Sequence, residues 1–223
     1  MARLHPRLQD ALPLLPVDRP VHLLTRHSVR ELAKNGFADY RLPLTPEGVA
    51  MARDWGRQLP RPVAAFHSSP VGRCVDTALA MYEGGRERGL AGHDLEVRHE
   101  TVLVEPGCYV EDIMRVGPLF FELGAVGFIN RHLQGDLAGV LEPEAGLYKL
   151  GQYLREREPG GGELAVHVTH DTILAAFMAG LAGREQISEA DWPWMMEGAW
   201  LWFEDERLHW VWRGEPGIRA LPF

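Results

Sequence analysis

The sequence predicts an α/β protein of three layers, α/β/α, with a mainly parallel central sheet. Three short apolar runs, each closed by polar residues and followed by a helix-like segment, lie at residues 21–25, 63–67 and 164–169. Such runs are typical of buried strands, and strands that alternate with helices favour a parallel sheet. Near the end of the chain, residues 199–203 and 208–212 flank the polar stretch 204–207, which indicates a C-terminal β-hairpin.

Length and composition indicate one domain, 1–223, with an insertion at about 105–144. The chain has 223 residues, of which 46% are hydrophobic and 24% charged, enough for one sizeable core. Its net charge of -8 argues against nucleic acid as a partner. Two cysteines are too few for a disulfide framework, so we expect a cytoplasmic protein. We find no signal peptide and no apolar segment of the roughly 20 residues that cross a membrane, so no membrane partner is expected.

The segments between the strands contain recognisable helix starts. Thr45-Pro46 is typical of a helix N-cap followed by proline in the first turn, and we expect that helix to run to about residue 58. Ser68-Ser69-Pro70 is expected to open the next helix in the same way. Further helices are predicted at about 143–157 and 173–182, with a short piece at 8–15 and a weaker strand at 95–104.

Two segments are expected to border a functional site. Residues 31–44 contain Asn35-Gly36 and Pro43 and are interpreted as a loop. Residues 105–144 contain many glycines and aromatic residues, and we expect short helices and loops there, packed over the site like a lid.

Three strand-to-helix junctions concentrate the chemistry. They are Arg26-His27-Ser28-Val29-Arg30, Ser68 to Arg73, and Thr169-His170-Asp171. In a parallel sheet such junctions lie on one edge, where helix N-termini favour anions. Arginine forks suit phosphate oxygens, and a histidine can act as nucleophile or proton carrier. These junctions therefore predict a site for a phosphoryl group.

The junctions resemble those of the histidine phosphatase superfamily, which includes acid phosphatases and phosphoglycerate mutases. Arg26-His27 with Arg30 resembles the Arg-His-Gly-x-Arg signature, and residues 44–48 resemble the Leu-Thr-x-x-Gly that follows it. Ser68-Ser69-Pro70 with Arg73 and residues 77–78 resembles a third family segment. Thr169-His170-Asp171-Thr172 resembles the His-Asp motif of the acid-phosphatase branch, to which we expect a closer relation. The resemblance implies a phosphoglycerate mutase-like fold.

The resemblance also implies roles for single residues. His27 would be the nucleophile that forms a phosphohistidine, while Arg26, Arg30, Arg73 and His170 would bind the phosphoryl oxygens. The general acid would be Asp171, which directly follows the second histidine; Glu105 is the alternative, as in the mutase-like branch. No metal and no cofactor would be needed.

Three functions are compatible with these residues. The first is a hydrolase, a phosphomonoesterase acting on a small-molecule phosphate ester. The second is a phosphomutase, in which the 105–144 insertion would keep the phosphoenzyme dry. The third is a non-catalytic phosphate-ligand binder, suggested by Ser28, which stands where the family has glycine and could shift the loop or crowd the phosphate. The aromatic hairpin could pack inward or against a second copy, so a homodimer stays open.

Overall fold

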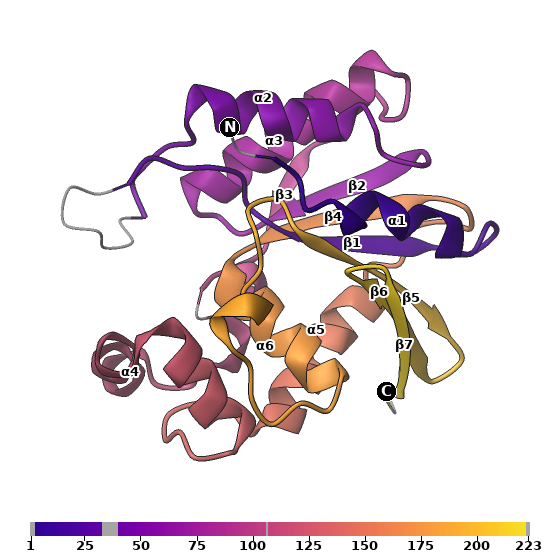
Figure 1. Cartoon of the computed structure of the whole chain (residues 1–223). Helices are drawn as coiled ribbons and strands as arrows, with labels where there is room; N and C mark the ends of the chain where they lie inside the picture. Colours follow the sequence, from indigo (N-terminus) through magenta and orange to yellow (C-terminus); the bar gives the residue numbers. More distant parts are fainter. Residues whose placement is uncertain (1–2, 33–39, 106, 222–223) are drawn as a thin grey trace.

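The computed structural model describes residues 3–32, 40–105 and 107–221, and within them a seven-stranded sheet lies at the centre (Figure 1). The predicted turn at Asn35-Gly36 lies outside the described residues. The strand order is β3-β2-β4-β1-β5-β6-β7. The strands are β1 (Val21–Arg26), β2 (Val63–Ser68), β3 (Val97–His99), β4 (Leu164–Thr169), β5 (Gly198–Glu204), β6 (Arg207–Trp212) and β7 (Glu215–Ala220).

The first half of this sheet is parallel and the second half antiparallel. β3, β2, β4 and β1 are parallel neighbours, with Arg26 opposite Thr169 and Ser68 opposite Val168. β5 pairs antiparallel with β1, and β6 and β7 continue in the same sense. The predicted α/β class and C-terminal hairpin are therefore confirmed. β7 extends the hairpin by one strand that the sequence analysis did not predict.

Helices cover both faces of the sheet, as Figure 1 shows. α2 and α3 lie on one face, and α4, α5 and α6 lie on the other. Each face has its own apolar core, with Trp55 and Met81 in one and Leu150 and Phe177 in the other. The helices are α1 (Arg7–Asp10), α2 (Pro46–Gly56), α3 (Gly72–Glu87), α4 (Ile113–Leu133), α5 (Pro143–Arg155) and α6 (Asp171–Leu181).

One predicted helix start is confirmed and another is wrong. The Thr45 side chain accepts a hydrogen bond from the Gly48 N–H at 2.9 Å, and Pro46 is the first residue of α2. α3 begins at Gly72, after Val71, without a side-chain cap. Ser69 instead uses its hydroxyl to accept from the Val71 N–H at 3.3 Å, which forms a turn before the helix. The strand expected at 95–104 is confined to β3 and is followed by a 3₁₀ turn at Thr101–Leu103.

The insertion contains a helix longer than expected. α4 spans 21 residues and, by length and composition alone, is apolar enough to cross a membrane, contrary to the sequence prediction. Gly124 breaks it with φ 66° and ψ 170°, outside the helical region, so two helical segments meet there. Ile113, Met114 and Phe121 are exposed on its surface. A lid role for this segment stays a prediction.

Several buried histidines lie in the sheet interior away from the strand ends. His22 Nδ1 is 3.0 Å from His167 Nε2, and the Tyr153 hydroxyl is 3.0 Å from His167 Nδ1. Burial lowers the pKa of His22 to about 3 and that of His167 well below its ordinary value. These rings are therefore neutral polar members of the core.

Candidate active site

The three strand-to-helix junctions meet at one edge of the sheet. β1, β4 and β2 are adjacent and parallel, so their carboxyl ends coincide. The His27 N–H donates to Thr169 O at 3.0 Å, and the Ser69 N–H donates to Val168 O at 2.9 Å. As a result, the rings of His27 and His170 lie 5.7 Å apart although 142 residues separate them. The spatial arrangement on which the phosphate-site prediction depended is present.

His27 is held in one tautomer. Its Nδ1 lies 2.7 Å from the Ser28 carbonyl oxygen, which can only accept, so Nδ1 carries the proton. Its Nε2 accepts from Arg73 Nε at 2.9 Å. Burial lowers the pKa of His27 well below its ordinary value, and the charges of Arg26 and Arg73 act in the same direction. The ring is therefore neutral, and its Nε2 lone pair is oriented by Arg73.

Ser28 does not face the site. Its hydroxyl donates to the Gly48 carbonyl oxygen at 2.7 Å, and its backbone N–H donates to Thr77 Oγ1 at 3.0 Å. A Cβ on Gly48 would lie 2.1 Å from Val29 O, so glycine is required for this close approach of α2 to the loop. The serine thus helps to fix the loop after β1 against α2. Its hydroxyl is buried and does not line the cavity described below, and an effect of this serine on phosphate binding stays a prediction.

Arg73 is the most connected side chain of the site. It is buried, and its Nη2 lies 3.1 Å from His170 Nδ1 and 3.7 Å from Glu105 Oε2. The guanidinium also stacks over the Tyr40 ring, 5.1 Å from its centroid. Its Nη1 has no hydrogen-bond partner among the described residues, although it is buried. A buried donor beside His27 that has no partner among the described residues is suited to an oxyanion.

Arg26 is held from behind by the chain before β5. Its guanidinium pairs with Asp171 and donates to Pro193 O at 2.5 Å. The backbone N–H of Arg26 donates to Glu197 O at 2.9 Å, and the buried Glu197 carboxylate pairs with Arg213 Nε at 2.7 Å. The Nε of Arg26 has no partner among the described residues. The loop of residues 193–197 therefore positions the first arginine of the signature.

His170 lies beside His27 but is fully buried. Because Arg73 can only donate, His170 Nδ1 accepts from it, and Nε2 therefore donates to Ser69 Oγ at 2.9 Å. Burial and the Arg73 charge lower the pKa of His170 well below its ordinary value. In this arrangement both ring nitrogens are engaged with protein groups. The predicted contact of His170 with phosphate stays a prediction.

The two candidate acids lie in different environments. Burial, followed by the charge of Asp171, raises the pKa of Glu105 to about 7. Glu105 Oε1 accepts from Thr172 Oγ1 at 2.7 Å, and Oε2 is 3.6 Å from His170 Nδ1. Asp171 is ion-paired with Arg26 and accepts from Trp192 Nε1 at 3.4 Å. Glu105 is therefore the carboxyl group that can be protonated near neutral pH.

A cavity of about 890 Å³ opens in front of these groups. Of the predicted site residues, His27, Arg30, Arg73, Glu105 and Asp171 line it, while Arg26 and His170 lie behind them. Arg30 is half-buried, and burial lowers its pKa from the ordinary value, with the Arg73 charge acting in the same direction. Apolar side chains of α4 line another side of the cavity. We call this set the α4 wall; it consists of Ile113, Val116, Phe120, Phe121, Ala125 and Val126.

Two aromatic residues outside α4, Tyr40 and Trp192, line the cavity and were not among the predicted site residues. Tyr40 stacks on Arg73 and donates from its hydroxyl to the Glu105 carbonyl oxygen at 3.3 Å. It belongs to the loop expected to border the substrate, but no motif marked it. Trp192 also lines the cavity. Its position before the aromatic hairpin was the only sequence signal for such a contact.

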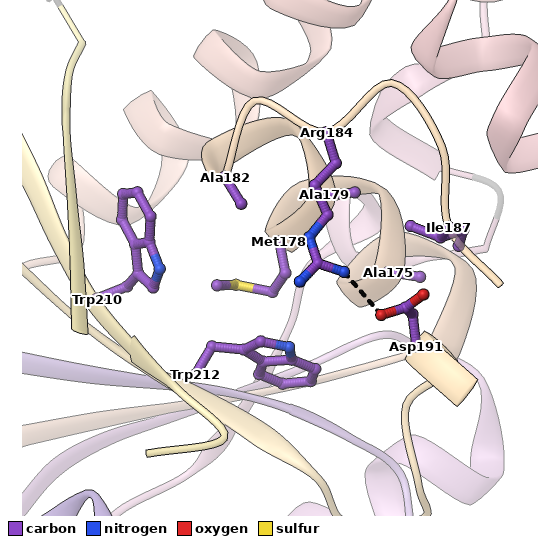
Figure 2. A pocket seen from close by; sticks show the side chains of 9 residues that line it. All are labelled: Ala175, Met178, Ala179, Ala182, Arg184, Ile187, Asp191, Trp210 and Trp212. Carbon is purple, nitrogen blue, oxygen red and sulfur yellow. Dashed lines mark hydrogen bonds and ion pairs between the residues drawn. The ribbon is translucent and has the colours of Figure 1, made fainter. Parts of the chain in front are cut away.

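A second, much smaller cavity lies between α6 and β6 (Figure 2). Its volume is about 50 Å³, and Trp210, Trp212 and Met178 lie around it. Arg184 and Asp191 form an ion pair of 2.7 Å at its side. That space admits little more than ordered water, so it is not a substrate site.

Comparisons with known proteins agree with the geometry. Residues 22–98 match the family model of the histidine phosphatase superfamily (branch 1). No curated protein matches the chain in sequence. Because the matching model is that of branch 1, the closer relation to the acid-phosphatase branch stays a prediction.

Solved structures share the fold at low sequence identity. A phosphoserine phosphatase mutant from Entamoeba histolytica, in complex with phosphoserine, is 18% identical, with a TM-score of 0.56 over 90% of this chain and 95% of that one. A phosphoglycerate mutase from Bacillus anthracis is 15% identical, with a TM-score of 0.54 over 92% and 94%. A mycobacterial glucosyl-3-phosphoglycerate phosphatase is 17% identical, with a TM-score of 0.53 over 90% and 96%. Residues 22–98 are therefore similar to the histidine phosphatase superfamily (branch 1), and the chain as a whole shares its fold with these solved structures.

Proposed function

We propose that the protein is a phosphomonoesterase that forms a phosphohistidine on His27 and then hydrolyses it. The observation that carries this proposal is that His27 Nε2, which holds a lone pair, lies at the cavity next to Arg73, whose buried Nη1 has no hydrogen-bond partner among the described residues. The first supplies a nucleophile and the second an oxyanion donor. Both are fixed in place before substrate binds.

In the first half-reaction, His27 Nε2 attacks the phosphorus atom and the bond to the leaving oxygen breaks. As the attack begins, Arg73 Nε shifts its hydrogen bond from Nε2 to a phosphoryl oxygen, which frees the lone pair, and Arg30 lies at the same cavity surface to neutralise charge. The Ser28 carbonyl stabilises the proton on Nδ1 as the ring becomes cationic. Positioning and positive charge account for most catalysis of this type.

We assign the proton donor to Glu105. A carboxyl group with a pKa of about 7 is half protonated at neutral pH and can protonate the leaving alkoxide. Asp171, which the sequence motif favoured, has its carboxylate engaged in an ion pair with Arg26. In the second half-reaction the Glu105 carboxylate accepts a proton from water, the water oxygen attacks phosphorus, and the N–P bond breaks. Phosphate and neutral His27 are regenerated.

A direct test is to trap the phosphoenzyme. Rapid acid-free quenching with labelled acetyl phosphate should give an adduct on His27 that is labile in acid and stable in base. His27→Ala should form no adduct and show no turnover, whereas the exposed His99→Ala serves as the matched control and should behave as the parent protein. Turnover that survives in His27→Ala would overturn the proposal.

The same experiment separates the alternatives. Phosphatase activity requires transfer of the label to water. Transfer to an added alcohol or sugar phosphate in preference to water would indicate a mutase instead. Tight binding of a phosphate ester without adduct or turnover would indicate a binding protein.

A further inference from the structure

We propose that the leaving group of the natural phosphate ester is bulky and apolar and carries no second anionic group. This inference rests on the proposed function, since it concerns the part of the cavity beyond the phosphoryl site. The cavity volume of about 890 Å³ is far larger than one phosphate needs and lies within the range of small-molecule sites. The remaining space must therefore accommodate the rest of the substrate.

The cavity has an ionisable part and an apolar part. At one end lie His27, Arg30, Arg73, Glu105 and Asp171, which are all ionisable. At the other end lies the α4 wall, whose side chains are aliphatic or aromatic and bring no hydrogen-bonding group. Trp192 adds a further ring beside Asp171. A substrate that reaches both ends therefore has a phosphate at one end and an apolar body at the other.

Charges on the lining residues disfavour an anionic leaving group. Among the described lining residues, the arginines lie at the phosphoryl end, and the charged side chain outside that end is Glu189. A carboxylate or second phosphate placed against the α4 wall would lose its hydration without gaining a cationic partner. An apolar group there would instead displace water from aromatic and aliphatic surface.

The exposure of α4 supports the same conclusion. Phe121 lines the cavity yet is 70% exposed, and Ile113, also on the wall, is 55% exposed. Apolar surface that faces open solvent next to a catalytic centre is typical of a binding surface. An apolar leaving group would cover part of it, and the break at Gly124 places two helical segments along the cavity.

The inference is tested with a series of n-alkyl phosphates from ethyl to decyl. Each methylene buried against the wall should raise kcat/KM about threefold to fourfold until the cavity is filled. Phosphoserine, 3-phosphoglycerate and glucose 6-phosphate should be poorer than octyl phosphate. A kcat/KM that is flat along the series, or higher for the anionic esters, would overturn the inference.

The wall itself is tested with two variants on the same helix. Phe121→Asp should lower kcat/KM for octyl phosphate about tenfold more than it lowers that for acetyl phosphate, because it puts a charge against the alkyl chain. Met114→Asp is the matched control, since Met114 is 82% exposed and does not line the cavity. Equal loss in both variants would show that the outer face of α4 matters rather than the cavity wall.

Acetyl phosphate separates this inference from the proposed function. It is small and has an activated leaving group, so it requires the phosphoryl end alone. If it forms no adduct on His27, the proposed function fails. If it is turned over but chain length has no effect, the function stands and the apolar site is refuted.

Discussion

The hydrogen bond between Thr172 and Glu105 allows the assignment of the proton donor to be tested without removing the donor. Thr172 Oγ1 donates to Glu105 Oε1 at 2.7 Å and favours the ionised carboxylate. Burial raises the pKa of Glu105 and this hydrogen bond lowers it, with a net value of about 7. Thr172→Val removes the hydroxyl that donates this hydrogen bond and keeps the shape of the side chain. The pKa of Glu105 should therefore rise.

The size of the shift follows from the strength of the bond. A hydrogen bond to a charged group is worth about 1.5–3 kcal/mol, and one pKa unit corresponds to about 1.4 kcal/mol, so a rise of at least about one unit is expected. In the parent protein, where the pKa is near 7, about a tenth of Glu105 is protonated at about pH 8. In Thr172→Val, with a pKa near 8, about half of Glu105 is protonated at that pH. The kcat/KM for an alkyl phosphate at that pH should therefore increase about fivefold.

The assay is the pH profile of kcat/KM for an alkyl and an aryl phosphate. In the parent protein the alkyl profile should fall above about pH 7, where Glu105 loses its proton. Glu105→Gln retains an acceptor for Thr172 and should lower the alkyl rate about 10²-fold or more, with a much smaller effect on the activated aryl ester. The assignment is refuted if Thr172→Val leaves the alkaline limb in place. It is also refuted if Asp171→Asn, rather than Glu105→Gln, shows the dependence on leaving group.

Three further predictions concern the frame of the site and the core. Burial lowers the pKa of His22 to about 3 and that of His132 to about 4, so below about pH 6.5 the unfolded chain takes up protons that the folded protein does not. Each of the two should remove about 1.4 kcal/mol from the free energy of unfolding between pH 7.5 and 5.5, and His27, His167 and His170, whose pKa values are also lowered, add to that loss. In urea titrations His132→Phe should therefore reduce the loss by about 1.4 kcal/mol, and an unchanged loss would contradict the lowered pKa of His132. Ser28→Ala leaves the buried Gly48 carbonyl without its donor and should cost about 1–3 kcal/mol, while kcat per folded molecule stays within about twofold; a loss of activity without a loss of stability would contradict this. Gly48→Ala places a Cβ 2.1 Å from Val29 O and should cost at least about 2 kcal/mol and lower activity by displacing the loop; an unchanged melting temperature would be inconsistent with the packing described.

The strand ends of the parallel half were predictable because their signal is local. β1, β2 and β4 are short apolar runs closed by polar residues. His27 and His170 directly follow β1 and β4, and Arg73 lies five residues after the end of β2. β7 was not predicted because Pro216 and Gly217 are poor strand formers. They are tolerated here because β7 lies at the edge of the sheet.

The site was predictable in its parts but not in its hydrogen bonds. That Arg73 would approach His27 follows from the parallel order of the strands. Its second role, as a partner of Glu105 and Tyr40, depends on how two irregular segments return to the sheet edge, which no periodic pattern encodes. The same applies to the elevated pKa of Glu105, because burial arises from packing of the whole domain. The sequence motif therefore favoured Asp171, and the surroundings favour Glu105.

The antiparallel half of the sheet supplies none of the proposed catalytic groups, yet it helps to hold Arg26, the neighbour of His27, in place. Arg213, in the turn after β6, anchors Glu197, and the loop that Glu197 belongs to holds both the backbone and the guanidinium of Arg26. Substitutions in the hairpin that displace Arg213 should therefore also displace Arg26, which lies next to His27. Engineering of these strands should preserve the ion pair of Arg213 with Glu197.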